Sequence, residues 1–541
     1  MKEISEDETL KQLLEDHEWP DVVSVLEGDE GRKEISIPDE EGKIALHRAC
    51  LNDAPLRIFR QLLEIYPEGV QKQDESGQLP LHLAAGNRAI EQDVLQALIE
   101  SYPEGLRVSD DEGQLPIHCA CIEEARLEIV RALIAAYPEG GNVMDDEGNL
   151  AIHWAFSNQL SSLDVVNALL DANPESSIRR NSNGSLPIHR ACANNAPKEV
   201  IQSLLQAFPS GSKERDEDDN LPLHLVCRKS NQDEVNLSVF GLASKAKVSD
   251  GEQQSLIKVV RTLLGSYPDG ASTVNKYGEL ALHRACTEEA PLELVDALIQ
   301  INPLGVAVRN KNTGALPLHL ACSYNAPVEV IQMLLLKYPK GAAITDERGY
   351  LPIHTACKNN ARLEVIQSLV ETNPDGAGTP DGNEAKLPIH YACMLQAPLE
   401  VTRFLISVYP KGLSTIDNDE NLPVHLACQS DSSTEIVQLL IDSYSDSAGI
   451  PDRKGDLPSD YAHRKEEELV KASLELINDN ANEVEMPEDM TESGDGWAKL
   501  IQFAENIEQD IIEIPMLTDN TTIDDLAEES VDPNLPGYST S

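Results

Sequence analysis

Histidine and cysteine recur together along most of this 541-residue chain. Eleven of the 13 histidines are spaced 35 or 36 residues apart, except for one interval of 59 residues. Nine of the ten cysteines follow one of these histidines by three residues. Residues three apart on a helix share a face, and imidazole and thiolate are ligands that zinc prefers. The spacing therefore raises one chemical hypothesis, a metal- or thiol-dependent enzyme that uses the His and Cys side chains.

A structural role for these residues is the better interpretation. A zinc site needs four converging ligands, whereas this array offers the same His/Cys pair nine times in a row. Free cysteine packs as a small hydrophobic residue, and no serine or cysteine has a dedicated base. We therefore expect no catalytic residue, no metal and no cofactor. The periodic histidines are His47, His82, His118, His153, His189, His224, His283, His319, His354, His390 and His425.

Each histidine lies in a repeated phrase that predicts the elements around it. The phrase, such as Leu79-Pro80-Leu81-His82, precedes a helical run that ends at an aromatic-Pro pair such as Tyr66-Pro67. An Asp-x-x-Gly turn such as 74–77 follows, and the phrase begins again. Proline suits the first turn of a helix, where its missing N–H has no partner to lose, and glycine supplies the positive φ of a tight turn. A unit is therefore predicted to be helix, turn, helix and hairpin.

This phrase resembles the T-P-L-H-x-A opening of the ankyrin repeat, whose period is about 33 residues. The resemblance covers roughly residues 36–480, about twelve units. It implies an all-α repeat solenoid, a curved rod of stacked helix-turn-helix-hairpin units in which the histidine bridges backbone groups of adjacent units. The tetratricopeptide repeat has a similar period, but the sequence lacks its W-x-x-L-G opening.

Three features depart from the family pattern. The Thr before the proline is Ile44 or Leu79 here, which removes the side-chain cap of that helix. The period is longer by two or three residues, and we place the extra residues between the aromatic-Pro pair and the Asp-x-x-Gly turn. In unit twelve Asp460 replaces the histidine, which indicates a terminal cap.

Five segments follow from these patterns. Residues 1–35 are expected to form an N-terminal helical cap, and residues 36–480 the solenoid. The long histidine interval places an insertion near 231–254. Residues 481–541 are expected to be an acidic, largely disordered tail that contains a candidate amphipathic helix at 497–512.

The charge and the cysteines limit the function classes. The formal charge is −50, with 93 acidic and 43 basic residues, so nucleic acid and anionic membranes are not expected partners. No apolar run approaches the ~18 residues of a membrane span, and the first residues are not typical of a signal peptide. Ten cysteines then indicate reduced thiols in the cytoplasm or nucleus. Acidic turns such as 145–148 lack the ligand pattern of a calcium loop.

Differences between the repeats indicate where a partner could bind. Positions that stay constant should face other units, whereas positions that vary can face a partner. In ankyrin-like folds the residue after the histidine, the residues after the cysteine position and the hairpin tips line the concave groove. The candidate partner-binding residues are Trp154, Tyr391, Tyr277, Tyr350, Tyr324, Arg190, Arg284, Glu112, Asp146, Glu217, Asp218, Asp419 and, in the tail, Trp497.

The sequence thus predicts a monomeric scaffold or adaptor that binds another protein through the concave groove. Acidic hairpin tips would favour a basic segment of the partner by electrostatic steering. Ankyrin repeats followed by an acidic tail are also similar to kappa-B-type inhibitors, so a sequestering inhibitor that masks a basic segment is the alternative. The metal- or thiol-dependent enzyme is the rival from another class.

Overall fold

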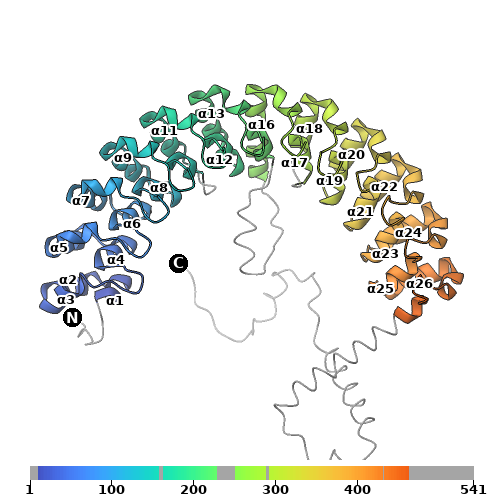
Figure 1. Cartoon of the computed structure of the whole chain (residues 1–541), viewed down its shortest axis with the longest axis horizontal. Coiled ribbons are helices and arrows are strands. Elements are labelled where there is room, and N and C mark those ends of the chain that lie inside the picture. The colour runs from blue at the N-terminus through green and yellow to red at the C-terminus, as the bar shows by residue number, and fades with distance from the viewer. Residues whose placement is uncertain (1–9, 157–161, 228–249, 288–290, 431, 462–541) are drawn as a thin grey trace, which may run out of the picture. The chain divides into compact units, whose positions relative to one another are not determined.

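The computed structural model describes residues 10–156, 162–227, 250–287, 291–430 and 432–461. They belong to one compact unit, Met1–Tyr461. All regular secondary structure of this described part is helical. Within this unit, Figure 1 shows the first helices of successive repeats in one row and the second helices in another. We call these the first-helix row and the second-helix row.

Each described repeat contributes a short first helix, a longer second helix and a five-residue 3-10 turn. The first helices are α4 (Ala45–Leu51), α6 (Pro80–Gly86), α8 (Pro116–Ile122), α10 (Ala151–Trp154), α12 (Pro187–Ala193), α14 (Pro222–Val226), α17 (Ala281–Thr287), α19 (Pro317–Ser323), α21 (Pro352–Lys358), α23 (Pro388–Met394) and α25 (Pro423–Gln429). The second helices are α5 (Leu56–Ile65), α7 (Gln92–Ser101), α9 (Leu127–Ala136), α11 (Leu163–Ala172), α13 (Lys198–Ala207), α16 (Asp250–Ser266), α18 (Leu292–Ile301), α20 (Val328–Lys337), α22 (Leu363–Thr372), α24 (Leu399–Val408) and α26 (Thr434–Ser443). The all-α repeat solenoid is confirmed.

The 3-10 turns lie where the extra residues of the longer period were predicted. They are η1 (Pro67–Gln71), η2 (Pro103–Arg107), η3 (Pro138–Asn142), η4 (Pro174–Ile178), η5 (Pro209–Lys213), η6 (Pro268–Ser272), η7 (Pro303–Ala307), η8 (Pro339–Ala343), η9 (Pro374–Gly378), η10 (Pro410–Ser414) and η11 (Ser445–Gly449). In the first repeat Tyr66 ends α5 with φ −134°, and Pro67 then occupies the first position of η1. The aromatic-Pro pair therefore ends one helix and begins the next, because proline fixes a helical φ and needs no N–H partner there.

The Asp-x-x-Gly turn, which we call the finger, is held by its own aspartate. Asp74 Oδ1 accepts hydrogen bonds from the backbone N–H groups of Ser76 (3.0 Å) and Gln78 (2.9 Å). Gly77 has φ +73°, a conformation that costs an L-residue about 1–2 kcal/mol. Most neighbouring fingers are joined by a backbone bond, as where the Asp111 N–H donates to the Ser76 carbonyl at 3.1 Å. The fingers therefore line up along one edge of the described stack.

The N-terminal segment and the end of the insertion differ from the repeat pattern. Helices α1 (Leu10–Glu15), α2 (Trp19–Glu27) and α3 (Asp29–Glu34) precede the first repeat, with Leu14 and Val22 buried. Helix α16 has 17 residues where the other second helices have ten, because it starts at Asp250. The last residues of the predicted insertion, 250–254, therefore lie within α16 and extend it at its N-terminal end.

The repeats share one hydrophobic core, in which the fourth residue of each ten-residue second helix is apolar except in α24. There the residue is Thr402, fully buried, and its hydroxyl has no hydrogen-bond partner. An unsatisfied buried hydroxyl costs about 1–3 kcal/mol. We expect Thr402→Val to raise the free energy of unfolding by about 1–2 kcal/mol, measured by urea denaturation and by slower hydrogen exchange in α24.

A matched control is Thr355→Val in α21. Thr355 is also buried, but its hydroxyl donates to the Pro352 carbonyl at 2.7 Å. This change removes a satisfied hydrogen bond and should lower the free energy of unfolding by about 1 kcal/mol. Equal effects of the two substitutions would contradict the assignment of an unsatisfied hydroxyl to Thr402.

Candidate functional site

The periodic histidines use both ring nitrogens. His82 Nδ1 accepts a hydrogen bond from the Leu79 backbone N–H (3.0 Å), and its Nε2 lies 3.1 Å from the Val108 carbonyl oxygen in the next repeat. Because Nδ1 accepts, Nε2 must carry the proton and donate it. The same pair of contacts recurs at all eleven periodic histidines. Neither nitrogen is left over for a metal or for proton transfer.

Burial tunes the histidines and cysteines toward their neutral forms. It lowers the pKa of His189, His354 and His390 to about 4. It raises the pKa of Cys121 and Cys227 to about 12, so their thiolates are scarce at neutral pH. In the described residues no group of three or more His, Cys, Asp and Glu side chains could hold a metal ion.

In several repeats the residue after the histidine, here the post-histidine position, donates a hydrogen bond to the finger of its own repeat. Trp154 Nε1 donates to Asp145 Oδ2 at 2.6 Å. This oxygen is the free one, because Asp145 Oδ1 accepts the Asn149 N–H and holds the turn. The same type of pair is formed by Arg48–Asp39, Tyr391–Asp381 and, in the partial twelfth repeat, Tyr461–Asp452. In these four repeats, different donors at this position therefore perform one structural task.

The expectation that Tyr391 and Tyr350 anchor a partner is wrong for their rings. Tyr391 is 1% exposed and Tyr350 is 7% exposed, and the rings meet edge to face with centroids 5.9 Å apart. The Tyr391 hydroxyl donates to Asp381 Oδ2 at 2.5 Å. Both tyrosines fill the space between neighbouring fingers, so a partner cannot reach them without opening the stack.

Other candidates remain accessible to different degrees. Tyr324, at the end of α19, is 50% exposed. The Tyr277 hydroxyl donates to Asp218 at 3.2 Å, which joins two fingers, and Arg284 forms an ion pair with Glu279 at 3.3 Å. The exposed acidic finger residues are Glu112, Asp146, Glu217 and Asp419. Trp497 and the predicted helix 497–512 lie outside the described residues.

Arg190 differs from the other arginines at the post-histidine position. Its guanidinium lies over the Trp154 ring, 5.8 Å from the centroid, and its Nε is buried without an acceptor. Burial lowers its pKa, with Glu147 and Asp145 acting in the opposite direction. The sequence carried a signal for this difference, because its finger begins with Asn181 where most fingers have Asp. Arg190 was predicted as a candidate from its variable position alone, and the Asn181 signal was not part of that prediction.

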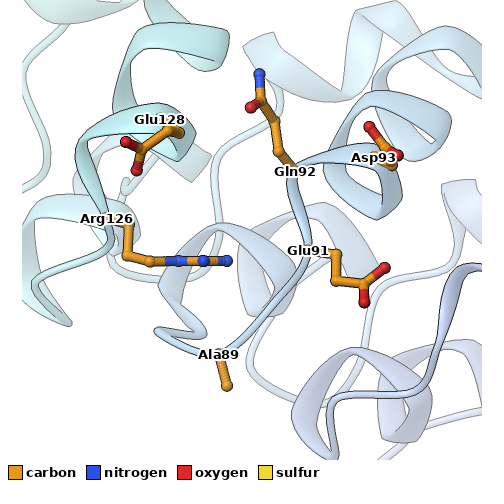
Figure 2. Close-up of a pocket in the computed structure, with 6 residues that line it drawn as sticks. All are labelled: Ala89, Glu91, Gln92, Asp93, Arg126 and Glu128. Atoms are coloured by element: carbon orange, nitrogen blue, oxygen red, sulfur yellow. The ribbon is translucent and has the colours of Figure 1, made fainter.

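A shallow depression of about 360 Å³ lies at the beginnings of α7 and α9. Figure 2 shows Arg126 reaching across it toward the chain that leads into α7, where it donates to the Ile90 carbonyl. The lining residues are Ala89, Glu91, Gln92, Asp93, Arg126 and Glu128. These side chains supply charge but no nucleophile with a base beside it, so the depression indicates a polar surface.

Comparison with known families decides the identity of the repeats. A family model described as Ankyrin repeats (3 copies) matches residues 88–179, 251–347 and 353–454, which together are more than half of the chain. The chain belongs to the ankyrin-repeat family. Ankyrin repeats indicate a protein-interaction domain. No curated protein matches the sequence of the chain.

Among the described helices of this ankyrin-repeat protein, none combines the length and the apolar character that crossing a membrane requires.

Acid should destabilise this ankyrin-repeat protein through its histidines. Burial depresses the folded-state pKa, so the unfolded chain, with a histidine pKa of about 6.5, binds protons first. The stabilisation is complete above about pH 6.5 and is lost as pH falls toward about 4, by up to ~1.4 kcal/mol per histidine and pH unit. We expect the melting temperature to fall between about pH 7 and about pH 5, measured by circular dichroism at constant ionic strength.

The control is His189→Gln, which removes one titrating group but keeps an amide that can both donate and accept. This variant should start less stable and show a shallower pH dependence than the wild type. A melting temperature that stays constant over this range would contradict the neutral, buried state of the histidines.

Proposed function

We propose that this chain is a scaffold or adaptor that holds another protein along the first-helix row and the fingers. One observation carries the proposal. Exposed carboxylates stand at the finger tips of several repeats, at Glu112, Asp146, Glu217 and Asp419, on an edge whose backbone is fixed by bonds between neighbouring fingers. A rigid edge with repeated charge suits an extended partner, because little conformational freedom is lost on binding.

The sign of the charge supports a basic segment as the partner. The chain carries −50 overall, and complementary charge raises association rates and suppresses wrong partners. The finger carboxylates that pair internally, such as Asp218 with Lys276 at 3.1 Å, contribute less to this field. We therefore expect binding to weaken with salt.

We extend the proposal to the organisation of the chain. The N-terminal cap is assigned to residues 1–35, the repeats to 36–480, the insertion to 231–254 and the acidic tail to 481–541. The protein is proposed to act without catalysis, as a monomer in the cytoplasm or nucleus. Free cysteines that are mostly buried support the reducing compartment, and the doubly bonded histidines support the absence of acid–base chemistry.

Site-specific crosslinking tests which surface binds. We expect a photoreactive phenylalanine analogue at Tyr324 in the full chain to crosslink a partner in the native extract, with identification by mass spectrometry. Tyr324 is 50% exposed at the end of a first helix, so the substitution leaves the core intact.

The matched position is Leu336 in α20, which is 78% exposed in the second-helix row. The same analogue there should give little of this crosslink. A partner captured from Leu336 and not from Tyr324 would show that the second-helix row binds instead.

The sequestering inhibitor is the second candidate, favoured by the composition of the C-terminal region. Residues 471–541 carry 18 acidic side chains against two lysines, enough to mask a basic segment. Deleting 481–541 should leave partner binding by a scaffold within about twofold, whereas it should restore the activity of a sequestered partner. Binding and partner activity measured on the same samples separate the two functions.

A further inference from the structure

Three repeats have arginine at the post-histidine position, and two of these arginines are neutralised by their own repeat. Arg48 donates to Asp39 in its finger, with Nε at 2.7 Å from Oδ2. Arg284 forms an ion pair with Glu279, five residues earlier, at 3.3 Å. Arg190 forms no ion pair with any described residue. This position therefore normally supplies its arginine with a carboxylate.

The reason for the exception is the finger of the Arg190 repeat. Asn181 stands where Asp39 stands in the Arg48 repeat, and Ser185 stands where Glu279 stands in the Arg284 repeat. The Asn181 amide is already engaged, since Oδ1 accepts the Ser185 N–H at 2.9 Å. Both places that neutralise the other arginines hold neutral side chains here.

The preceding repeat does not compensate. Asp145 Oδ2 accepts the Trp154 indole N–H at 2.6 Å, and Asp145 Oδ1 holds the finger turn. Glu147 accepts from Asn149 at 3.1 Å. Neither carboxylate approaches the Arg190 guanidinium within ion-pair distance in the described structure, so they act on it only through space.

The surroundings of Arg190 make a missing anion costly. The side chain is half-buried, the Nε–H is buried without an acceptor, and the Trp154 ring covers one side at 5.8 Å. Of the Arg190 nitrogens that have no hydrogen-bond partner, Nε alone is buried, so the two Nη groups are accessible to solvent. A guanidinium that is partly removed from water gains strongly from a carboxylate, because the two groups can form charge-assisted hydrogen bonds.

We propose that Arg190, with Trp154 beside it, binds an aspartate or glutamate side chain of a partner peptide lying along the first-helix row. The proposal rests on the scaffold function and adds one requirement to its partner. The post-histidine residue of the next repeat is the half-buried Leu225, so apolar residues of the peptide fit next to the acidic one. The partner segment is thus basic toward the finger tips and acidic at one defined point.

The proposed ligand is a carboxylate and not a phosphorylated side chain. A phosphate carries close to two charges at neutral pH, and Asp145 and Glu147, which act on Arg190 through space, repel it more strongly than they repel a carboxylate. A single negative charge matches the single unpaired guanidinium. Phosphoserine in place of the acidic residue should therefore weaken binding.

Selection of displayed random peptides on the full-length protein provides the test. We expect enriched peptides to share one Asp or Glu flanked by apolar residues. For such a peptide, Asp→Asn or Glu→Gln should weaken binding to the wild type by about tenfold or more, measured by fluorescence anisotropy. The protein variant Arg190→Gln should cause a similar loss and should bind both peptides alike.

Two variants guard against trivial effects of substitution. Asn181→Asp supplies the carboxylate that the finger lacks, so it should weaken peptide binding. It also loses the hydrogen bond from Asn181 Nδ2 to Asn149 Oδ1 (2.8 Å), which the new ion pair with Arg190 should offset, so that a cooperative melting transition is retained. Arg284→Gln removes an arginine that is already paired and should leave the affinity for the selected peptide unchanged. Together they separate an occupied guanidinium from an unfolded protein.

The outcomes are distinguishable from failure of the scaffold function. Enriched peptides without a shared acidic residue, or an acid preference that persists in Arg190→Gln, overturn this site but leave the scaffold function standing. Peptides that prefer phosphoserine over the carboxylate also overturn it. If no peptide is enriched on the folded protein, both the site and the scaffold function are contradicted.

Discussion

Each periodic histidine joins its own repeat to the next, with Nδ1 accepting from the start of its helix and Nε2 donating to the following repeat. Leu79 supplies no side-chain cap, and the His82 ring instead accepts the buried backbone N–H of Leu79 at this helix start. Both contacts require a neutral ring with the proton on Nε2. The orientation of the neighbouring helices, the burial of the cysteines and the placement of the fingers all depend on this one tautomer.

The two carboxylate oxygens of the finger aspartate likewise make two different contacts. One carboxylate oxygen holds the turn, as Asp145 Oδ1 does, and the other accepts a donor from the first helix of the same repeat, as from Trp154. Residues at the post-histidine position can therefore vary in size and shape while the finger stays in place. Where the finger lacks the carboxylate, the donor remains available, and Arg190 is the clearest case. Structural support and recognition thus share one position.

Much of this architecture follows from the sequence, because the period, Leu-Pro-x-His and Asp-x-x-Gly are local signals with local causes. The fold and the packing role of cysteines such as Cys121 were predictable for this reason. The burial of Tyr391 was not, because it depends on a carboxylate ten residues earlier that only the folded finger brings within reach. Leu304 and Leu336, 79% and 78% exposed, also escaped prediction, since apolar residues in helices are expected to face the core.

The histidine contacts give the stack a direction. Asp460 replaces the histidine of the last repeat and still accepts the Leu457 N–H at 2.7 Å, but an ionised carboxylate has no proton to donate onward. Repeats ahead of Asp460 can be duplicated without loss, because each copy brings both a donor and an acceptor. A repeat added behind Asp460 would begin without that donor. In evolutionary terms, tandem duplication ahead of Asp460 keeps every link between repeats, whereas duplication behind it loses one.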